Sequence, residues 1–180
     1  MGAGGSIPER LDLETCKNVA GLKFDQETFD SLCDDQGFVT KSQLFRVAEK
    51  SRALEAVSRD GRALRSLSRD MRDDREVVLS AVSNDGSSLV YASERLKADR
   101  VVVLDAVVQN WRALGLASSD LKADIEVVLA AVAQDARAVH FANDHMRSNP
   151  TVQDAVEDSI TRSTIWTEGF ATLQEQTGSS

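Results

Sequence analysis

The first six residues, MGAGGS, have the spacing of an N-terminal acylation site. The enzyme that attaches myristate recognises the pattern M-G-x-x-x-[ST], in which glycine becomes the acceptor once the initiator methionine is removed. Gly2 and Ser6 occupy the two required positions, and the small residues between them leave the α-amino group accessible. The alternative interpretation is a small-residue terminus that carries no lipid. If Gly2 is acylated, a second membrane contact is required, because one myristoyl chain binds a membrane only marginally.

Basic residues between positions 46 and 75 are the predicted second contact. This segment holds nine basic residues against six acidic ones. Four of its arginines are spaced by three, four and three residues: Arg62, Arg65, Arg69 and Arg72. On a single helix they would lie within about 80° of arc, where they could bind lipid headgroups or an acidic protein surface. The alternative is a solvated helix face balanced by nearby aspartates. Palmitoylation of Cys16 is a further candidate, although that residue lies in a predicted helix.

Oxygen-bearing side chains surround Gly37 at a spacing suited to calcium. In a calcium-binding loop the ligands occupy positions 1, 3, 5, 7, 9 and 12, with glycine at position 6. With Gly37 at position 6, positions 3, 5 and 9 hold Asp34, Gln36 and Thr40. The segment KFDQETFDSLCDDQGFVTKSQLFRVAEK resembles one EF-hand, in which such a loop joins two helices. Positions 1 and 12 lack the acidic residues of that family. We therefore favour a structural helix-loop-helix, with a calcium-responsive sensor as the alternative.

Residue types that carry out catalysis form no recognisable set in this sequence. His140 and His145 lie five positions apart, about 140° around a helix, so they do not share one face for a metal. A hydroxyl or amide residue recurs with a fixed period: Ser68, Ser93, Ser118 and Asn143. Recurrence indicates packing or capping rather than a single nucleophile. We therefore predict no enzymatic activity, no cofactor and no small-molecule substrate.

The composition is that of an α-helical protein. The 180 residues include two prolines, 5% aromatic and 42% hydrophobic residues, so the core must consist mainly of Ala, Val and Leu. A net charge of −8 argues against nucleic-acid binding. Two cysteines make no disulfide framework, and no apolar run reaches the length of a transmembrane helix. We expect a cytoplasmic protein, associated with the cytosolic face of a membrane if Gly2 is acylated.

One phrase occurs four times along the middle of the chain. Leucine recurs every 25 residues: Leu54, Leu79, Leu104 and Leu129. Each is followed, 20 places on, by a residue that can cap a helix: Asp74, Asp99, Asp124 and Asn149. A period of this length is the signature of a stacked array of repeats.

Each repeat is predicted to form two short helices. After the cap at Asp99, an apolar stripe follows: Val102, Val103, Ala106 and Val107. A polar pair and a turn residue then break the helix, and a second helix is expected to point apolar residues inward. In the preceding repeat these are Leu89, Ala92 and Leu96. The sequence therefore predicts an all-α fold, an α-solenoid of four 25-residue helical-hairpin repeats with an N-terminal helix-loop-helix.

The segment DREVVLSAVSNDGSSLVYASERLKAD resembles a family of short tandem helical repeats whose function is unknown. The resemblance covers residues 51–158 and implies a repeat fold, with no catalytic residues to carry over. The predicted organisation is an N-terminus at 1–9, the helix-loop-helix at 10–50, the repeats at 51–158, and a capping helix with a tail at 159–180. The helix-loop-helix is either a separate domain or the cap over the first face of the array.

These features favour a non-enzymatic adaptor or scaffold that binds protein partners. Trp111 is assigned to a predicted binding surface, because it replaces the turn glycine of earlier repeats, Gly61 and Gly86, and such departures from the repeat pattern mark edges or surfaces. The four spaced arginines complete that surface, and Gly2 supplies a membrane tether. A structural subunit of a larger assembly, in which Trp111 is a buried contact, is the remaining alternative.

Overall fold

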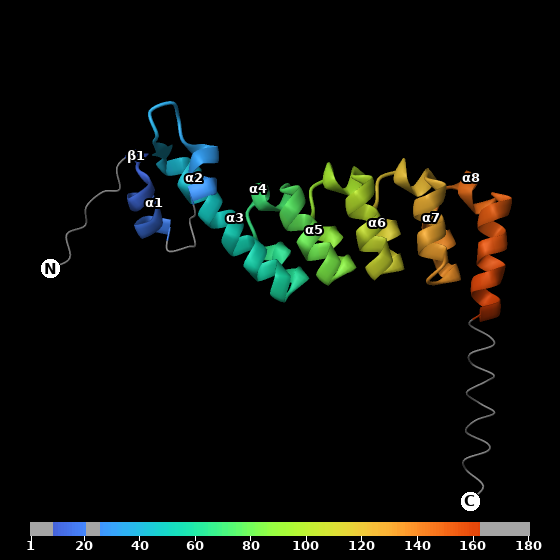
Figure 1. Ribbon diagram of the computed structural model, residues 1–180. Coiled ribbons are helices and arrows are strands. Elements are labelled where there is room, and N and C mark those ends of the chain that lie inside the picture. Colours follow the sequence, from blue (N-terminus) through green and yellow to red (C-terminus); the bar gives the residue numbers. More distant parts are fainter. Residues whose placement is uncertain (1–8, 21–25, 163–180) are drawn as a thin grey trace, which may run out of the picture. The chain divides into compact units, whose positions relative to one another are not determined.

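The computed structural model describes residues 9–20 and 26–162 (Figure 1). The chain divides into two compact units, Met1–Glu55 and Ala56–Ser180, and the division falls within the long helix α3 (Lys41–Arg59). The predicted acylation site at Gly2 lies outside the described residues. So does most of the predicted C-terminal helix, from residue 163 onward.

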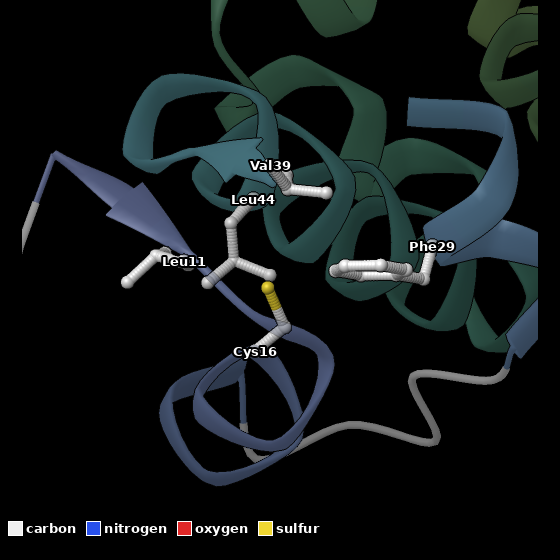
Figure 2. Close-up of a cluster of buried hydrophobic side chains, with 5 residues drawn as sticks. All are labelled: Leu11, Cys16, Phe29, Val39 and Leu44. Carbon is white, nitrogen blue, oxygen red and sulfur yellow. The ribbon is translucent and has the colours of Figure 1, made fainter. Parts of the chain in front are cut away.

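The first unit contains a small apolar core and a short strand pair that the sequence does not predict. Its helices are α1 (Leu13–Ala20), α2 (Gln26–Leu32) and the first part of α3. Strands β1 (Arg10–Leu11) and β2 (Val39–Thr40) pair antiparallel. Figure 2 shows the buried cluster of this unit: Leu11, Cys16, Phe29, Val39 and Leu44. The helix-loop-helix therefore has a core of its own.

Cys16 is part of that core and is not available for lipid attachment in the folded unit. Its side chain is fully buried, and its sulfur points toward Leu44 (Figure 2). Burial and the negative charge of Asp12 raise the pKa of the Cys16 thiol. Because the thiolate is the nucleophile, a buried and protonated thiol is inert. The burial of Cys16 therefore disfavours its palmitoylation while the unit is folded.

The second unit repeats one pattern of α-helices along the chain. Three of them are α5 (Arg75–Asn84), α6 (Arg100–Gln109) and α7 (Ile125–Val132). Each begins after an aspartate whose carboxylate accepts two backbone N–H groups of the first turn, which confirms the predicted caps at Asp74, Asp99 and Asp124. The helix α6 lies between α5 and α7 and contacts both (Figure 1).

The predicted apolar stripe forms the core of this unit. In α6 the stripe residues have no exposed surface: Val102, Val103, Ala106 and Val107. Their equivalents in α5 and α7 are buried to the same degree. Full burial of one valine side chain stabilises a fold by about 1.5–3 kcal/mol, so this recurring stripe is a main source of the unit's stability.

The predicted second helix of each repeat is not a single α-helix. Instead, a six-residue 3-10 helix follows each α-helix: η1 (Gly61–Ser66), η2 (Gly86–Tyr91), η4 (Trp111–Leu116) and η6 (Ala136–Phe141). One or more extended residues and a short helical turn come next: α4 (Arg69–Arg72), η3 (Leu96–Ala98), η5 (Leu121–Ala123) and α8 (Asp144–Arg147). Leu89, Ala92 and Leu96 are buried as expected, but Ala92 is extended, with ψ of 157°.

Two capping side chains in each repeat cause this break. The carboxylate of Asp85 accepts the N–H of Ser87 at 2.9 Å, which ends α5 and starts η2. The hydroxyl of Ser93 accepts the N–H of Leu96 at 3.3 Å and starts η3. The same bond is made by the residues that recur with Ser93: Ser68, Ser118 and Asn143. Of the two roles that the sequence allows for this recurring position, packing and capping, the structure shows capping.

Hydrogen bonds and ion pairs join each repeat to the next. Three backbone bonds recur with the repeat period: Ser93 N–H to the Arg72 carbonyl (3.0 Å), Ser118 to Lys97 (3.0 Å) and Asn143 to Lys122 (3.2 Å). In addition, the Nε of Arg75 lies 2.8 Å from Asp99, and the Nε of Arg100 lies 2.9 Å from Asp124. Each of these arginines opens one α-helix and binds the aspartate that caps the next α-helix.

Residues 150–162 are helical and follow the predicted cap at Asn149. The Asn149 side chain accepts the N–H of Thr151 at 3.0 Å, and Pro150 takes the first helical position, where no N–H is needed. This helix continues across residue 158, so the predicted boundary between repeats and capping helix falls inside one element. Within the described ranges, no helix has the length and apolar character needed to cross a membrane.

Candidate functional site

Trp111 begins η4 at a position where the two preceding repeats have glycine. There, a Cβ on Gly61 would lie 2.4 Å from a carbonyl oxygen of the next α-helix, and a Cβ on Gly86 would lie 2.2 Å from one. Both α6 and α7 pack against η4, and α7 has 8 residues where α5 and α6 have 10.

Gln134 connects Trp111 to the following repeat. The N–H of Trp111 donates to Gln134 Oε1 at 3.2 Å, and Gln134 Nε2 donates to the Val108 carbonyl at 2.8 Å. Asn84 makes the equivalent bond to the N–H of Gly61 at 2.9 Å. The backbone of Trp111 is thus held in the same way as that of a turn glycine, although its side chain is large.

Aromatic and guanidinium groups gather around Trp111. The ring of Phe141 lies 5.8 Å from that of Trp111, centroid to centroid, at an interplanar angle of 38°. The guanidinium carbon of Arg112 lies 4.3 Å from the Trp111 ring and that of Arg137 lies 5.3 Å away. Each such cation–π contact contributes about 0.5–1 kcal/mol at an exposed site. We call these four residues the aromatic–arginine cluster.

The two arginines of the cluster differ in their acidic neighbours. Arg137 binds both oxygens of Asp135, the cap of η6, with a shortest contact of 2.5 Å. This ion pair lowers the pKa of Asp135 to about 2. The cap of η4 is the neutral Asn110. Consequently Arg112 has no carboxylate in its own repeat at the place of Asp135, and its acidic neighbour is Asp135 of the next repeat, whose pKa the Arg112 charge also helps to lower.

The Asp135–Arg137 pair predicts a pH-dependent stability. A carboxyl whose folded pKa is about 2, against 3.8 when unfolded, stabilises the fold above pH 3.8. That contribution is lost as the pH falls from 3.8 through 2. Asp135→Asn keeps the cap and removes the charge, so its melting temperature should lie below that of the wild type at neutral pH and approach it in acid. Thermal melts over this range test the expectation, and a difference that does not change with pH would contradict it.

A groove lies beside the cluster, between η2 and η4, with a volume of about 430 Å³. Its apolar surface is formed by Val90, Tyr91, Ala113 and Leu116. Val90 is 45% exposed and so offers apolar surface on the groove wall. Arg62 and Arg112 also line the groove. The groove therefore combines an open apolar surface with two cations.

The four arginines that the sequence places on one helix face do not lie on one helix. Arg62 and Arg65 belong to η1, and Arg69 and Arg72 belong to α4. The residues at 67 and 68 are extended, with ψ near 160°, and separate the two elements. The prediction of a single stripe is wrong because it assumed one continuous helix.

The structure distributes these arginines over two sites. Arg62 lines the groove and donates from Nε to Asp85 at 2.8 Å. Arg69 and Arg72 line a second pocket, of about 530 Å³, in which they are accompanied by acidic residues such as Asp73. Arg65 is exposed on η1. Of the predicted surface residues, only Arg62 and Trp111 are therefore brought close to the groove and the cluster.

The predicted calcium ligands Asp34 and Gln36 bind an arginine of the chain itself. Arg10, on β1, pairs with one carboxylate oxygen of Asp34 and donates to Gln36 Oε1 at 2.9 Å. The other Asp34 oxygen accepts the N–H groups of Gln36 and Phe38, at 3.0 and 3.1 Å. The Arg10 hydrogen bond is the largest cause that lowers the pKa of Asp34. Within the described ranges, no group of three or more His, Cys, Asp or Glu is placed to hold a metal ion.

The rest of the loop is closed by side-chain hydrogen bonds. Gly37 has a φ of 75°, the left-handed conformation that favours glycine and that position 6 requires. Thr40 donates from its hydroxyl to Gln43 Oε1 at 2.6 Å, and Gln43 Nε2 donates to the Leu32 carbonyl at 3.1 Å. Gln43 occupies position 12 and Leu32 position 1. Their hydrogen bond joins the two ends that calcium joins in a loaded loop.

We predict that calcium produces no saturable heat when it is titrated into the full chain. Arg10 already places a positive charge on Asp34 and Gln36, and a calcium ion would have to displace it. Isothermal titration calorimetry on the wild type and on Asp34→Ala checks this expectation. A saturable signal that Asp34→Ala removes would contradict it and would restore the calcium-sensor interpretation.

Sequence reasoning missed most members of the cluster, although the repeat alignment contains a signal for them. Arg62, Arg112 and Arg137 share one position of the repeat, 50 and 25 residues apart. Phe141 likewise shares its position with Tyr91, two periods earlier. A search for large or charged residues that recur at exposed positions would have found both series.

The comparisons with known proteins give one match. The family model described as Domain of unknown function (DUF4116) matches residues 50–97 and 99–147. Each matched segment spans about two of the 25-residue periods, and together they cover more than half of the chain. No curated protein and no solved structure matches it. The chain therefore belongs to the DUF4116 family of tandem helical repeats.

Proposed function

We propose that this chain is a non-enzymatic scaffold whose four 25-residue units stack as an α-solenoid. The stack is supported by the equivalent burial of the stripes in α5, α6 and α7, and by the backbone bonds that recur between repeats. A unit of this kind cannot bury its apolar face alone, so neighbouring units stabilise one another. The row of 3-10 helices then forms a continuous surface for a protein partner.

The observation that carries the binding function is the aromatic–arginine cluster. Tryptophan, tyrosine and arginine are the residues most enriched among those that dominate interface energies. Trp111 is half-buried, Phe141 is 37% exposed, and both arginines are exposed. Such a group of exposed aromatic and apolar side chains with a polar rim is typical of a protein-interaction site.

Co-purification from native cells tests this proposal. Wild-type chain and Trp111→Ala/Phe141→Ala should differ in the proteins that they retain, because the variant lacks both rings. Val101→Ser is the matched control, since Val101 is an exposed apolar residue on α6, outside the cluster and the groove. Two outcomes would contradict the assignment. In one, Val101→Ser loses the same proteins as the double variant, and in the other, neither variant loses any protein.

A membrane tether at Gly2 forms the second part of the proposal. Its support is the M-G-x-x-x-S pattern of the first six residues. Arg65 and Arg69 are the exposed members of the predicted arginine set that do not line the groove, and they are proposed as the second contact. The mass of the N-terminal peptide from native cells tests the tether. An unmodified or acetylated terminus would remove it and would leave the scaffold proposal unchanged.

A further inference from the structure

We infer that the groove between η2 and η4 binds a short acidic segment of the partner, with one large apolar side chain seated against Val90 and Leu116. This inference rests on the proposed binding function and specifies the chemistry of the partner. The occupant is a peptide in which an aspartate or glutamate lies close to a leucine, isoleucine, methionine or phenylalanine.

The charge at one side of the groove favours a carboxylate. Arg112 lines the groove, is exposed, and has the neutral Asn110 where Arg137 has Asp135. Its guanidinium carbon lies 4.3 Å from the Trp111 ring. A guanidinium can stack on a ring through its face while its N–H edge binds an acceptor. A ligand carboxylate would pair with Arg112 as Asp135 pairs with Arg137 in the next repeat.

A second guanidinium supports the same partner. Arg62 comes from η1 and uses its Nε to bind Asp85, and its side chain is 70% exposed. Among the described residues, its two terminal NH₂ groups form no hydrogen bond, since the bond to Asp85 uses Nε. Arginine pairs with carboxylates in a planar, directional manner. The terminal NH₂ groups of Arg62 therefore provide a second place in the groove where a carboxylate of the peptide can bind.

The apolar part of the groove explains why a charged ion alone is not the occupant. Val90 is 45% exposed, and Leu116 is half-buried beside the fully buried Ala113. Covering these side chains removes apolar surface from water, which contributes about 25 cal/mol per Å². A peptide side chain can supply that cover and hold a carboxylate near Arg112 at the same time.

One substitution tests the charge argument without removing any side chain from the groove. Asn110→Asp retains the oxygen that accepts the Arg112 N–H at 3.1 Å and should reproduce the Asp135–Arg137 ion pair with Arg112. The guanidinium would then be neutralised inside the chain. Asn143→Asp is the matched control, because Asn143 is also a cap, for α8, and lies outside the groove.

The experiment selects random 12-residue peptides displayed on phage against the full chain. The selected peptides are then measured by fluorescence anisotropy on the wild type and on the two variants. We expect enriched peptides to carry a carboxylate within two positions of a large apolar residue. Their affinity should fall about tenfold on Asn110→Asp, stay within about twofold on Asn143→Asp, and weaken as salt is raised.

The outcomes separate this inference from the proposed function. Enriched peptides that are basic or uncharged, or whose affinity Asn110→Asp does not change, would overturn the acidic partner. If Val90→Ser and Trp111→Ala/Phe141→Ala still reduced their binding, the surface itself would remain a protein-binding site. If no peptide depended on these residues and the co-purified proteins were also unaffected, both the inference and the proposed function would fail.

Discussion

Replacing Gly86 with alanine is expected to lower the free energy of unfolding by about 1–3 kcal/mol, which is the range for forcing extra atoms into a packed region. The added Cβ would lie 2.2 Å from the carbonyl oxygen of Ala106 and 3.0 Å from the Cβ of Gln109. Both atoms belong to α6, which is fixed by its neighbours on either side. Gly86 does not have a positive φ, so the loss would be steric and not conformational.

Urea unfolding followed by circular dichroism measures this loss, with Gly115→Ala as the control. The atoms nearest to a Cβ on Gly115 would belong to the ring of Phe141, at 3.0 Å and beyond, and that exposed side chain can move. Gly115→Ala should therefore cost clearly less than Gly86→Ala. Equal effects of the two substitutions would show that close approach to the α6 backbone is not what requires glycine.

Leu114→Ala is expected to cost about 2–5 kcal/mol, the range for removing a fully buried leucine side chain. Leu114 has no exposed surface and belongs to η4, which packs against both α6 and α7. The loss combines the transfer of the removed atoms with the cavity that the rigid neighbouring helices leave unfilled. The free energy of unfolding in urea provides the measurement.

Leu116→Ala, two residues further along the same 3-10 helix, is the natural comparison. Leu116 is half-buried and lines the groove, so its truncation leaves little cavity and should cost much less stability. It should instead weaken the binding of groove peptides. A Leu116→Ala variant as unstable as Leu114→Ala would mean that this side chain is part of the core, and the groove would have to be redefined.

The α-helices could be predicted from the sequence because their determinants are local. Asp99 caps α6 by accepting N–H groups two and three residues ahead, at 3.0 and 3.2 Å. The stripe from Val102 to Val107 follows helical spacing within one turn and a half. Comparing four copies of the same pattern then separates the residues that matter from those that vary.

The 3-10 helices could not be predicted in the same way. Leu89, Ala92 and Leu96 have spacings of three and four, which suit an α-helix and also suit two shorter turns. The deciding contacts are distant in sequence. Ser93 donates its N–H to the carbonyl of Arg72, in the preceding repeat, and this bond holds the chain extended where an α-helix would continue.

The candidate site was only partly predictable for a related reason. Trp111 could be singled out because it stands at the repeat position that holds glycine in the two preceding repeats. Its neighbours Phe141 and Arg137, however, come from the next repeat. The four-arginine stripe was wrong for the opposite reason, because it placed residues of two elements on one helix. Both cases depend on how one repeat lies against another, which spacing within a repeat does not determine.

The backbone bonds between repeats have a consequence for how such a protein changes over generations. The hydrogen bonds donated by the N–H groups of Ser93, Ser118 and Asn143 join main-chain atoms of neighbouring repeats, so they do not depend on which side chains the 3-10 helices carry. An in-frame duplication or deletion of one 25-residue period would recreate the same backbone hydrogen bond between the repeats that become neighbours. The gene could therefore lengthen or shorten its product in a single step, while mutation alters the exposed side chains of each copy independently.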